Sequence, residues 1–387
     1  MVCNVKLLIH ASSATYGLQG QDTNQPIGAE KNEALAEFSK AGYKLADYRT
    51  PQNSGGTAAA PMAALCLEPT SGDNGPIVIA FRGTKKKDDI WSNLNVGAKG
   101  VAKKEQRDAA FAFYEEMQKK YPNREIILTG HSLGGNLAQY VAARAYSQAD
   151  SAGKPMPTLS VRTFNPAPIK TRYSEVFTKR PELTKQIVNY RLSKDVISSD
   201  KTPFHASYGD MYVFQSKLGT KKAHDLSSML QEIPPAVLNR TIGFSKNDQL
   251  IEQVNGSFES YQCRVNNQWF PGFRQGAVNL NAFETRKQSL LAALQNHDYG
   301  EAKAIIAELR NDTSGSTSTH LLNVLHNNIE DTEKTEKIKP AVSMSPLASS
   351  QGQWSDTINH HLPAAVSKNQ TLELTPSLDE PSMSPSK

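Results

Sequence analysis

The segment around Ser132 constrains the fold of this chain more than any other feature. From Arg124 to Ala145 the sequence reads "REIILTGHSLGGNLAQYVAARA", an apolar run, then a Gly-x-Ser-x-Gly turn, then a small-residue helical pattern. Such a turn can hold a serine in a strained position between a strand and a helix, where the glycines relieve crowding. A tight turn with an incidental serine is the alternative, since the five letters alone arise by chance. The flanking strand and helix favour the strained elbow.

Strands and helices alternate along the first 230 residues. Between Ala63 and Gly83, two apolar runs flank a Ser-Gly-Asp-Asn-Gly cluster, and the second run, Ile77–Phe81, is apolar enough for a strand buried on both faces. Further strands are expected at 125–129, 159–166 and 186–192, and helices at 105–120 and 136–146. This interleaving predicts an α/β fold with a mainly parallel central sheet.

The character of the sequence changes after the α/β pattern, and three parts are expected. Residues 1–232 form the α/β domain, 233–310 a small and mostly helical region, and 311–387 a largely disordered polar tail with one short helix at Thr317–Asn328. The tail holds too little apolar area to offset the entropy of ordering it. In the helical region two helices should face each other through Leu290, Leu291, Leu294, Ile305, Ile306 and Leu309.

Composition excludes several classes of protein. The 387 residues carry a net charge of only +5, spread along the chain, so a nucleic-acid partner is not expected. Three distant cysteines indicate neither a disulfide framework nor a zinc site. The N-terminal apolar run is too short for a secretory signal or a membrane span. We therefore expect a cytoplasmic protein, or one exported without a Sec signal peptide.

A serine nucleophile needs a base, which an acid in turn orients. Asp195 follows the predicted strand "QIVNYRL", at the sheet edge where parallel strands carry functional residues, and Asp200 is its competitor. For the base, His224 follows the predicted strand 211–215, whereas His205 precedes it and suits a structural or pocket-lining role. We favour Asp195 and His224.

The alkoxide that forms during acyl transfer needs hydrogen-bond donors. The N–H of Leu133, at the start of the predicted helix, is one candidate. Thr84 is the second, because it follows the buried strand 77–81 and a glycine turn on the same edge of the sheet. The alternative for this turn is an ordinary loop with Arg82 exposed.

Taken together, the blocks "VIAFRGT", "DDIWSNL", "ILTGHSLGGNLAQ", "VRTFNPAP" and "VNYRLSKDVIS" resemble the class 3 lipases, relatives of the fungal triacylglycerol lipases. The resemblance covers roughly residues 35–230 and implies an α/β-hydrolase fold. It implies a triad of Ser132, Asp195 and His224, with Thr84 and Leu133 as the oxyanion hole. The family often has glycine where Asn165 stands, and proline where Ser198 stands.

The resemblance also implies an activity, the hydrolysis of carboxylic esters of lipids through an acyl-enzyme, of lipase or phospholipase A type. No metal or organic cofactor is needed for it. An esterase or thioesterase acting on small soluble substrates is one alternative, and a non-catalytic interaction protein of the same fold is another. The sequence leaves these alternatives and the oligomeric state open.

Two further expectations concern the surface. Ile90, Trp91 and Leu94 are candidates for an amphipathic lid, with His131 as a further pocket residue, and Lys85–Lys87 could contact anionic membrane surfaces transiently. A solvated charge run is the alternative for these lysines. The long polar C-terminus resembles in composition the C-terminal signals of bacterial effectors, although a cytoplasmic protein with a flexible tail fits the same residues.

Overall fold

A computed structural model describes most of the chain. The described residues are 2–18, 27–28, 32–50, 62–72, 74–84, 102–198, 205–206, 208–243, 245–265, 280–312 and 316–338. Met1–Lys339 forms one compact unit, so the expected α/β domain and the helical region belong to the same unit.

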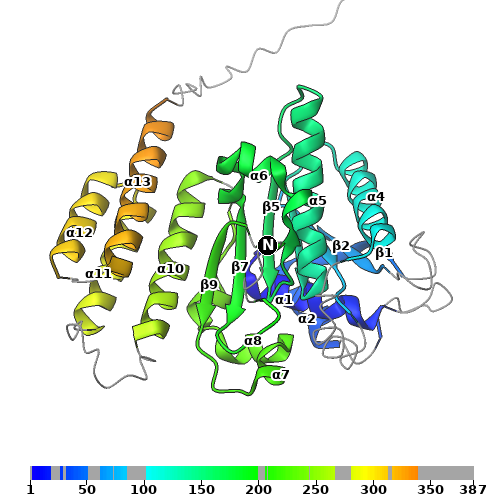
Figure 1. The fold of residues 1–387 in the computed structure, drawn as a ribbon, viewed down its shortest axis with the longest axis horizontal. Coiled ribbons are helices and arrows are strands. Elements are labelled where there is room, and N and C mark those ends of the chain that lie inside the picture. The colour runs from blue at the N-terminus through cyan, green and yellow to red at the C-terminus, as the bar shows by residue number, and fades with distance from the viewer. Residues whose placement is uncertain are drawn as a thin grey trace, which may run out of the picture. The chain divides into compact units, whose positions relative to one another are not determined.

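A seven-stranded sheet lies at the centre of this unit, in the order β1-β2-β3-β4-β5-β7-β9 (Figure 1). The first three strands pair antiparallel, and β3, β4, β5, β7 and β9 are all parallel. A mainly parallel sheet covered by helices is the α/β-hydrolase fold that the sequence predicts. The strands are β1 (Tyr43–Arg49), β2 (Ala64–Pro69), β3 (Ile77–Phe81), β4 (Ile126–His131), β5 (Leu159–Phe164), β7 (Ile187–Leu192) and β9 (Asp210–Phe214), with the two-stranded pair β6 (Ile169–Lys170) and β8 (His205–Ala206).

Helices cover both faces of the sheet. Helix α1 packs on β3, β4 and β5 together with α2 and α8, whereas α5 packs on β3, β4 and β5 beside α4. The helices are α1 (Val5–Ala14), α2 (Asn32–Ala41), α4 (Lys104–Lys120), α5 (Leu133–Ser151), α6 (Glu175–Lys179), α7 (Thr220–Ala223), α8 (Leu226–Glu232), α9 (Pro235–Leu238), α10 (Lys246–Val265), α11 (Leu280–Gln295), α12 (Tyr299–Asp312) and α13 (Ser316–Ile338). Short 3-10 turns are η1 (Thr15–Gly17), η3 (Thr171–Tyr173) and η4 (Pro181–Gln186).

Strand β3 shows why the sheet needs two layers of helices. All five of its residues are buried, as its sequence predicts. Side chains alternate between the faces of a strand, so Val78 and Ala80 belong to the core under α1, and Ile79 and Phe81 to the core under α4 and α5. The N-terminal apolar run, too short for a membrane span, forms the buried helix α1, where Asn4 caps Leu7 through a 2.8 Å hydrogen bond.

Helices α10 to α13 form a third core of their own. The apolar residues expected to join two helices, Leu290 and Ile306 among them, are buried there. The prediction that this region ends at 310 is corrected by α13, a 23-residue helix that extends it to Ile338. Leu322, Leu325 and Ile329 supply the buried face of α13, and their three- and four-residue spacing lies within a composition that otherwise indicated a polar tail.

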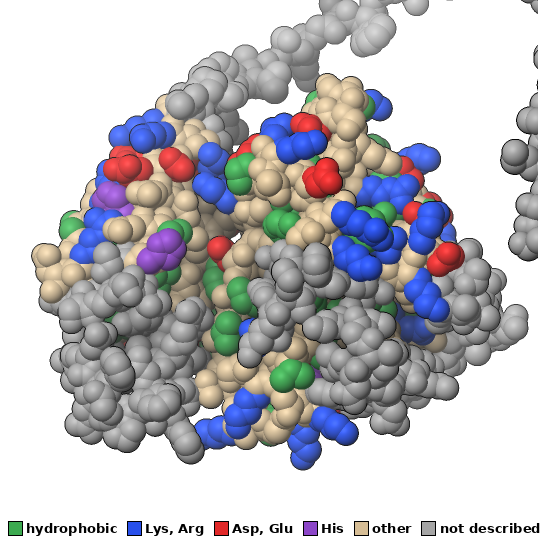
Figure 2. Space-filling view, in the orientation of Figure 1, with side chains coloured by type: hydrophobic (Ala, Val, Ile, Leu, Met, Phe, Trp, Pro, Cys, Tyr) green, Lys and Arg blue, Asp and Glu red, His purple; other side chains and the backbone are tan. Residues whose placement is uncertain are grey.

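The described surface carries mixed charge. On the face drawn in Figure 2, Asp and Glu side chains lie near Lys and Arg in the upper part, whereas only Lys and Arg mark the lower edge of the described surface. Among the described residues, no cluster of His, Cys, Asp and Glu suits a metal ion. None of the described helices combines the length and the apolar character that a membrane crossing requires.

Candidate active site

The backbone at Ser132 has the strained geometry of an elbow. Ser132 follows β4, begins α5 as its N-cap, and lies in the left-handed region with φ 57° and ψ −124°. The glycines on either side are required by close approach. A Cβ on Gly130 would overlap the backbone of Gly134, and a Cβ on Gly134 would overlap the carbonyl of Phe81 in β3. The close packing on both sides of Ser132 requires both glycines, and a turn with an incidental serine would not require them.

Asp195 and His224 form a buried hydrogen-bonded pair. Nδ1 of His224 donates to Oδ1 of Asp195 at 2.9 Å, and both side chains are buried. Asp195 lies three residues beyond the end of β7, and His224 lies between α7 and α8, after β9. The two residues favoured from the sequence are thus brought into direct contact.

Every remaining acceptor site on Asp195 is engaged locally. Its oxygens accept the backbone N–H groups of Ile197 at 3.1 Å and Ser198 at 3.2 Å, and the Ser198 hydroxyl at 2.5 Å. A proline at 198 could offer neither of the two Ser198 donors. Burial acts to raise the pKa of Asp195, but His224, with Ser198 and Ile197, holds that pKa below its usual value. Asp195 is thereby kept charged beside His224.

The other ring nitrogen of His224, Nε2, is buried, and among the described residues nothing hydrogen-bonds to it. Because Nδ1 donates to Asp195, the neutral ring carries its free electron pair on Nε2. A buried acceptor without a hydrogen bond lowers the stability of the fold, so a fold that keeps one indicates a functional use for that atom.

The two residues predicted for the oxyanion hole, Thr84 and Leu133, lie at the carboxyl ends of parallel strands. Thr84 lies just beyond β3, on the same edge as Ser132 after β4. Between them, Gly83 packs so closely that a Cβ there would lie 3.4 Å from the Cβ of Ser132. Leu133 opens α5, where the first N–H groups of a helix lack intrahelical partners. Arg82 is buried, which removes the alternative of an exposed ordinary turn.

A hydrogen-bonded chain that the sequence analysis missed joins these segments. The Tyr16 hydroxyl lies 2.9 Å from Nδ1 of His131, and Nε2 of His131 lies 2.6 Å from the backbone carbonyl of His224. A carbonyl only accepts, so His131 donates from Nε2 and Tyr16 donates to Nδ1. The backbone of Gly83 also hydrogen-bonds to Tyr16. His131 thus ties η1, the elbow and His224 together, and its role as a pocket residue stays a prediction.

Asn165 is a second residue whose role the sequence did not reveal. It follows β5 with φ 41°, in the left-handed region that glycine occupies most readily and asparagine tolerates. Its Nδ2 donates to the carbonyl of Ala223 at 2.8 Å, and its Oδ1 accepts from the N–H of Leu192 at 2.9 Å. Asn165 therefore fixes the segment before His224 to the end of β7, and its departure from the family's glycine is structurally compatible.

Some predicted residues lie outside what the structure describes. Ile90, Trp91, Leu94 and Lys85–Lys87 fall in an undescribed range, as does Asp200. For His205, the backbone belongs to β8, and the side chain is outside the described part. The lid and its membrane contact remain predictions.

A family model described as phospholipase-like, a Tle-like phospholipase domain, matches residues 19–241. No curated protein is significantly similar to the chain. Similar solved structures include a triacylglycerol lipase with a serine-protease triad as its catalytic centre (15% identity, TM-score 0.38, 54% of this chain and 78% of that one). Two others are a lipase from Rhizopus microsporus var. chinensis (14%, 0.33, 54% and 72%) and a mono- and diacylglycerol lipase from Aspergillus oryzae (14%, 0.37, 56% and 80%).

Proposed function

The chain belongs to the family of Tle-like phospholipase domains, which supports lipid ester hydrolysis, and we propose that it cleaves the carboxylic esters of glycerophospholipids with Ser132 as nucleophile. One observation carries the proposal. In the buried pair of Asp195 and His224, no described residue bonds to Nε2 of His224, and the backbone of the same histidine is tied to His131, the residue that precedes Ser132.

The proposed reaction uses the chain's own groups alone. His224 Nε2 takes the proton of the Ser132 hydroxyl as its oxygen attacks the acyl carbonyl, and Asp195 stabilises the imidazolium that forms. Backbone N–H groups of Thr84 and Leu133 hold the resulting oxyanion. Collapse breaks the ester bond, and the imidazolium gives its proton to the departing lysophospholipid alkoxide.

The second half of the reaction restores the enzyme. A water molecule gives a proton to His224 Nε2 and attacks the acyl-Ser132 carbonyl. The second oxyanion collapses, the fatty acid leaves, and the proton on His224 returns to the Ser132 oxygen. Each turnover therefore consumes one ester and one water and yields one acid and one alcohol.

The strained backbone at Ser132 supports its role as nucleophile. A side chain at φ 57° stands clear of the helix that it begins, and the free N–H groups of that helix face the developing negative charge. Tyr16 and His131 act as positioning residues in this proposal, since they hold the His224 backbone against the elbow.

The experiment compares three substrates on the full chain: phosphatidylglycerol vesicles, a triglyceride emulsion and p-nitrophenyl butyrate. We expect fatty acid release from the vesicles at the highest kcat/KM, with loss of all activity in Ser132→Ala. Ser12→Ala, at an equally buried serine in α1, is the matched control and should keep full activity.

Covalent labelling provides an independent measurement. A fluorophosphonate should add to the peptide that contains Ser132, as read by mass spectrometry, and this labelling should need His224. Activity that survived Ser132→Ala would refute the nucleophile, and preference for the p-nitrophenyl ester would assign a soluble ester instead of a phospholipid.

A further inference from the structure

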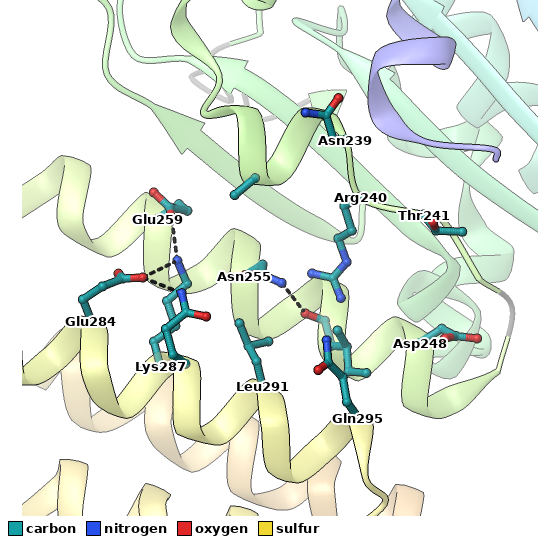
Figure 3. A pocket seen from close by; sticks show the side chains of 13 residues that line it. Asn239, Arg240, Thr241, Asp248, Asn255, Glu259, Glu284, Lys287, Leu291 and Gln295 are labelled. Carbon is teal, nitrogen blue, oxygen red and sulfur yellow. Dashed lines mark hydrogen bonds and ion pairs between the residues drawn. The ribbon is translucent and has the colours of Figure 1, made fainter. Parts of the chain in front are cut away.

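A cavity that shares no lining residue with the proposed active site lies where the family-matched residues 19–241 end and the helical region begins. Its volume is about 530 Å³, and it is bounded by the segment after α9 and by helices α10 and α11 (Figure 3). Polar amide side chains are prominent in its wall, contributed by Asn239, Asn255, Gln288 and Gln295. A polar wall of this kind suits a hydrophilic ligand.

Arg240 is the unusual residue in this wall. Figure 3 shows it reaching from the segment after α9 toward α10 and α11. Its Nη1 is buried, and within the described part of the chain it has no hydrogen-bond partner. Guanidinium stays charged at any physiological pH, so a buried N–H that lacks an acceptor costs stability. An acceptor supplied by a ligand would remove this cost.

The carboxylates that interact electrostatically with Arg240 already accept hydrogen bonds from other residues. Glu252 attracts Arg240 most strongly, yet its oxygens are held by Arg162 at 2.9 and 2.6 Å and by Tyr190 at 2.6 Å. Asp248 also attracts Arg240 and accepts the hydroxyl of Ser245 at 2.6 Å. Nη1 of Arg240 therefore lies in an attractive field, and no oxygen of the described residues bonds to it.

The remaining charges of the wall limit what a ligand can carry. Lys287 is paired with Glu259 and lies 3.6 Å from Glu284, so it is neutralised within the protein. Two basic residues, Arg240 and Lys287, face three acidic ones, Asp248, Glu259 and Glu284. With this excess of one carboxylate, a multiply charged anion would be repelled, whereas a single negative charge can bind at Arg240.

We propose that this cavity binds a small polar molecule through one singly charged oxyacid group, a carboxylate or a phosphodiester, that accepts hydrogen bonds from Arg240. The two oxygens of such a group match the planar fork of a guanidinium. The amides of Asn255 and Gln295 lie where hydroxyl or carbonyl groups on the rest of the ligand could bond. The site is independent of Ser132 and of the reaction proposed there.

Titration calorimetry on the full chain tests this with two matched pairs of probes. Gluconate is compared with sorbitol, which lacks the carboxylate, and diethyl phosphate with triethyl phosphate, which lacks the charge. We expect at least one charged probe to bind at millimolar concentration or below, and its neutral counterpart to bind at least about tenfold more weakly. The charged probe that binds identifies the oxyacid.

Three variants locate the binding. Arg240→Gln should weaken the charged probe by about tenfold or more, and Arg240→Lys should weaken it less, because it keeps the charge without the fork. Arg180→Gln, at an exposed arginine paired with Asp150, should bind as the wild type does. Thermal unfolding of each variant shows that it is folded.

Three results would overturn the proposal. They are the absence of binding by any charged probe to the wild type, equal binding of charged and neutral probes, and unchanged binding in a folded Arg240→Lys or Arg240→Gln variant. The first two results need no variant, so they decide even if both substitutions prevent folding.

Discussion

Two buried side-chain pairs lie along neighbouring strands of the same sheet and differ in how completely they are hydrogen-bonded. Arg162 of β5 meets Glu252 of α10 in a two-fold contact at 2.9 and 2.6 Å, and its third nitrogen donates to Ser160 and to the carbonyls of Val161 and Gln186. Asp195 is equally well bonded, but Nε2 of its partner His224 is buried and has no hydrogen-bond partner in the described part of the chain.

Under the proposed function, this difference in bonding separates a structural pair, Arg162 with Glu252, from a reactive pair, Asp195 with His224. A buried charge pair stabilises a fold only when its remaining donors and acceptors are satisfied, and Arg162 with Glu252 meets that condition. The pair fixes α10, and with it the helical region, to the sheet. In the proposed reaction, the Asp195 pair uses the same physical devices to hold a base in one orientation and leaves its outer nitrogen for substrate chemistry. Four tests can break or sharpen this comparison.

The largest effect is expected from His224→Ala. Loss of the general base should lower kcat by about 10⁴-fold, while the melting temperature changes little because Asp195 keeps its bonds to Ser198 and Ile197. The measurement is fatty acid release from vesicles, with unfolding followed in parallel.

His10 is the matched control for this variant. Its Nε2 is also buried without a hydrogen bond, but the nearest carboxylate, Glu33, is 3.9 Å from that same nitrogen. His10→Ala should therefore keep kcat. An equal loss in both variants would show that an open buried nitrogen does not distinguish the site.

Glu252→Ala should have the opposite signature. It leaves the Arg162 guanidinium buried without its carboxylate, which costs about 3–5 kcal/mol of unfolding free energy. Activity per folded molecule should persist, because neither residue contacts the Asp195 pair. The measurement is chemical unfolding, with kcat at a temperature where the variant is folded.

A double substitution provides the control. Arg162→Met combined with Glu252→Leu removes both charges and should recover most of the lost stability, as replacement of a whole buried pair often does. If the double variant were as unstable as the single one, packing of α10 and not the unpaired charge would explain the loss.

The sequence predicted these two pairs unequally. Asp195 and His224 follow strands at the functional edge of a parallel sheet, so chain order and strand ends were enough to propose them. Arg162 and Glu252 are 90 residues apart, and nothing in the local pattern around either links it to the other. Periodicity reports which face of an element is buried, but it does not report which buried polar groups meet.

The same limit explains the other misses. Tyr16 reaches His131 across 115 residues from a segment whose sequence indicated only a short apolar run. The elbow itself was predictable because its strand, glycines and helix are contiguous. The length of α13 was not, because its apolar spacing lies within a Ser-, Glu- and Lys-rich composition that favoured a polar tail.

Tyr16→Phe tests whether the reactive pair depends on its supports. The variant loses the hydroxyl that donates to His131, a bond worth about 1 kcal/mol, so kcat should fall by about fivefold with KM nearly unchanged. A purely structural role would lower stability without this selective loss of kcat.

Tyr43→Phe supplies the comparison. Its buried hydroxyl donates to the carbonyl of Pro76 at 3.2 Å, in contact with neither His131 nor His224. We expect a similar loss of stability in this variant and full kcat. Equal kcat in the two variants would remove Tyr16 from the positioning of His224.

The smallest expected effect is on the stability of the protein in acid. Here a substitution in either pair should change the unfolding free energy in the same direction. Burial acts to raise the pKa of Asp195 and of Glu252, yet their hydrogen-bonded partners hold both pKa values below the usual ones. A depressed pKa contributes stability that is present above the unfolded value, about 3.9 for Asp and 4.3 for Glu, and is lost as the pH falls through the folded value. Asp195→Asn and Glu252→Gln should therefore each flatten the decline of unfolding free energy below about pH 4, measured by chemical unfolding at several pH values. If the slope of unfolding free energy against pH were unchanged in Asp195→Asn, His224 would not hold this carboxylate charged. The proposed distinction between the two pairs would then rest only on the unbonded Nε2 of His224.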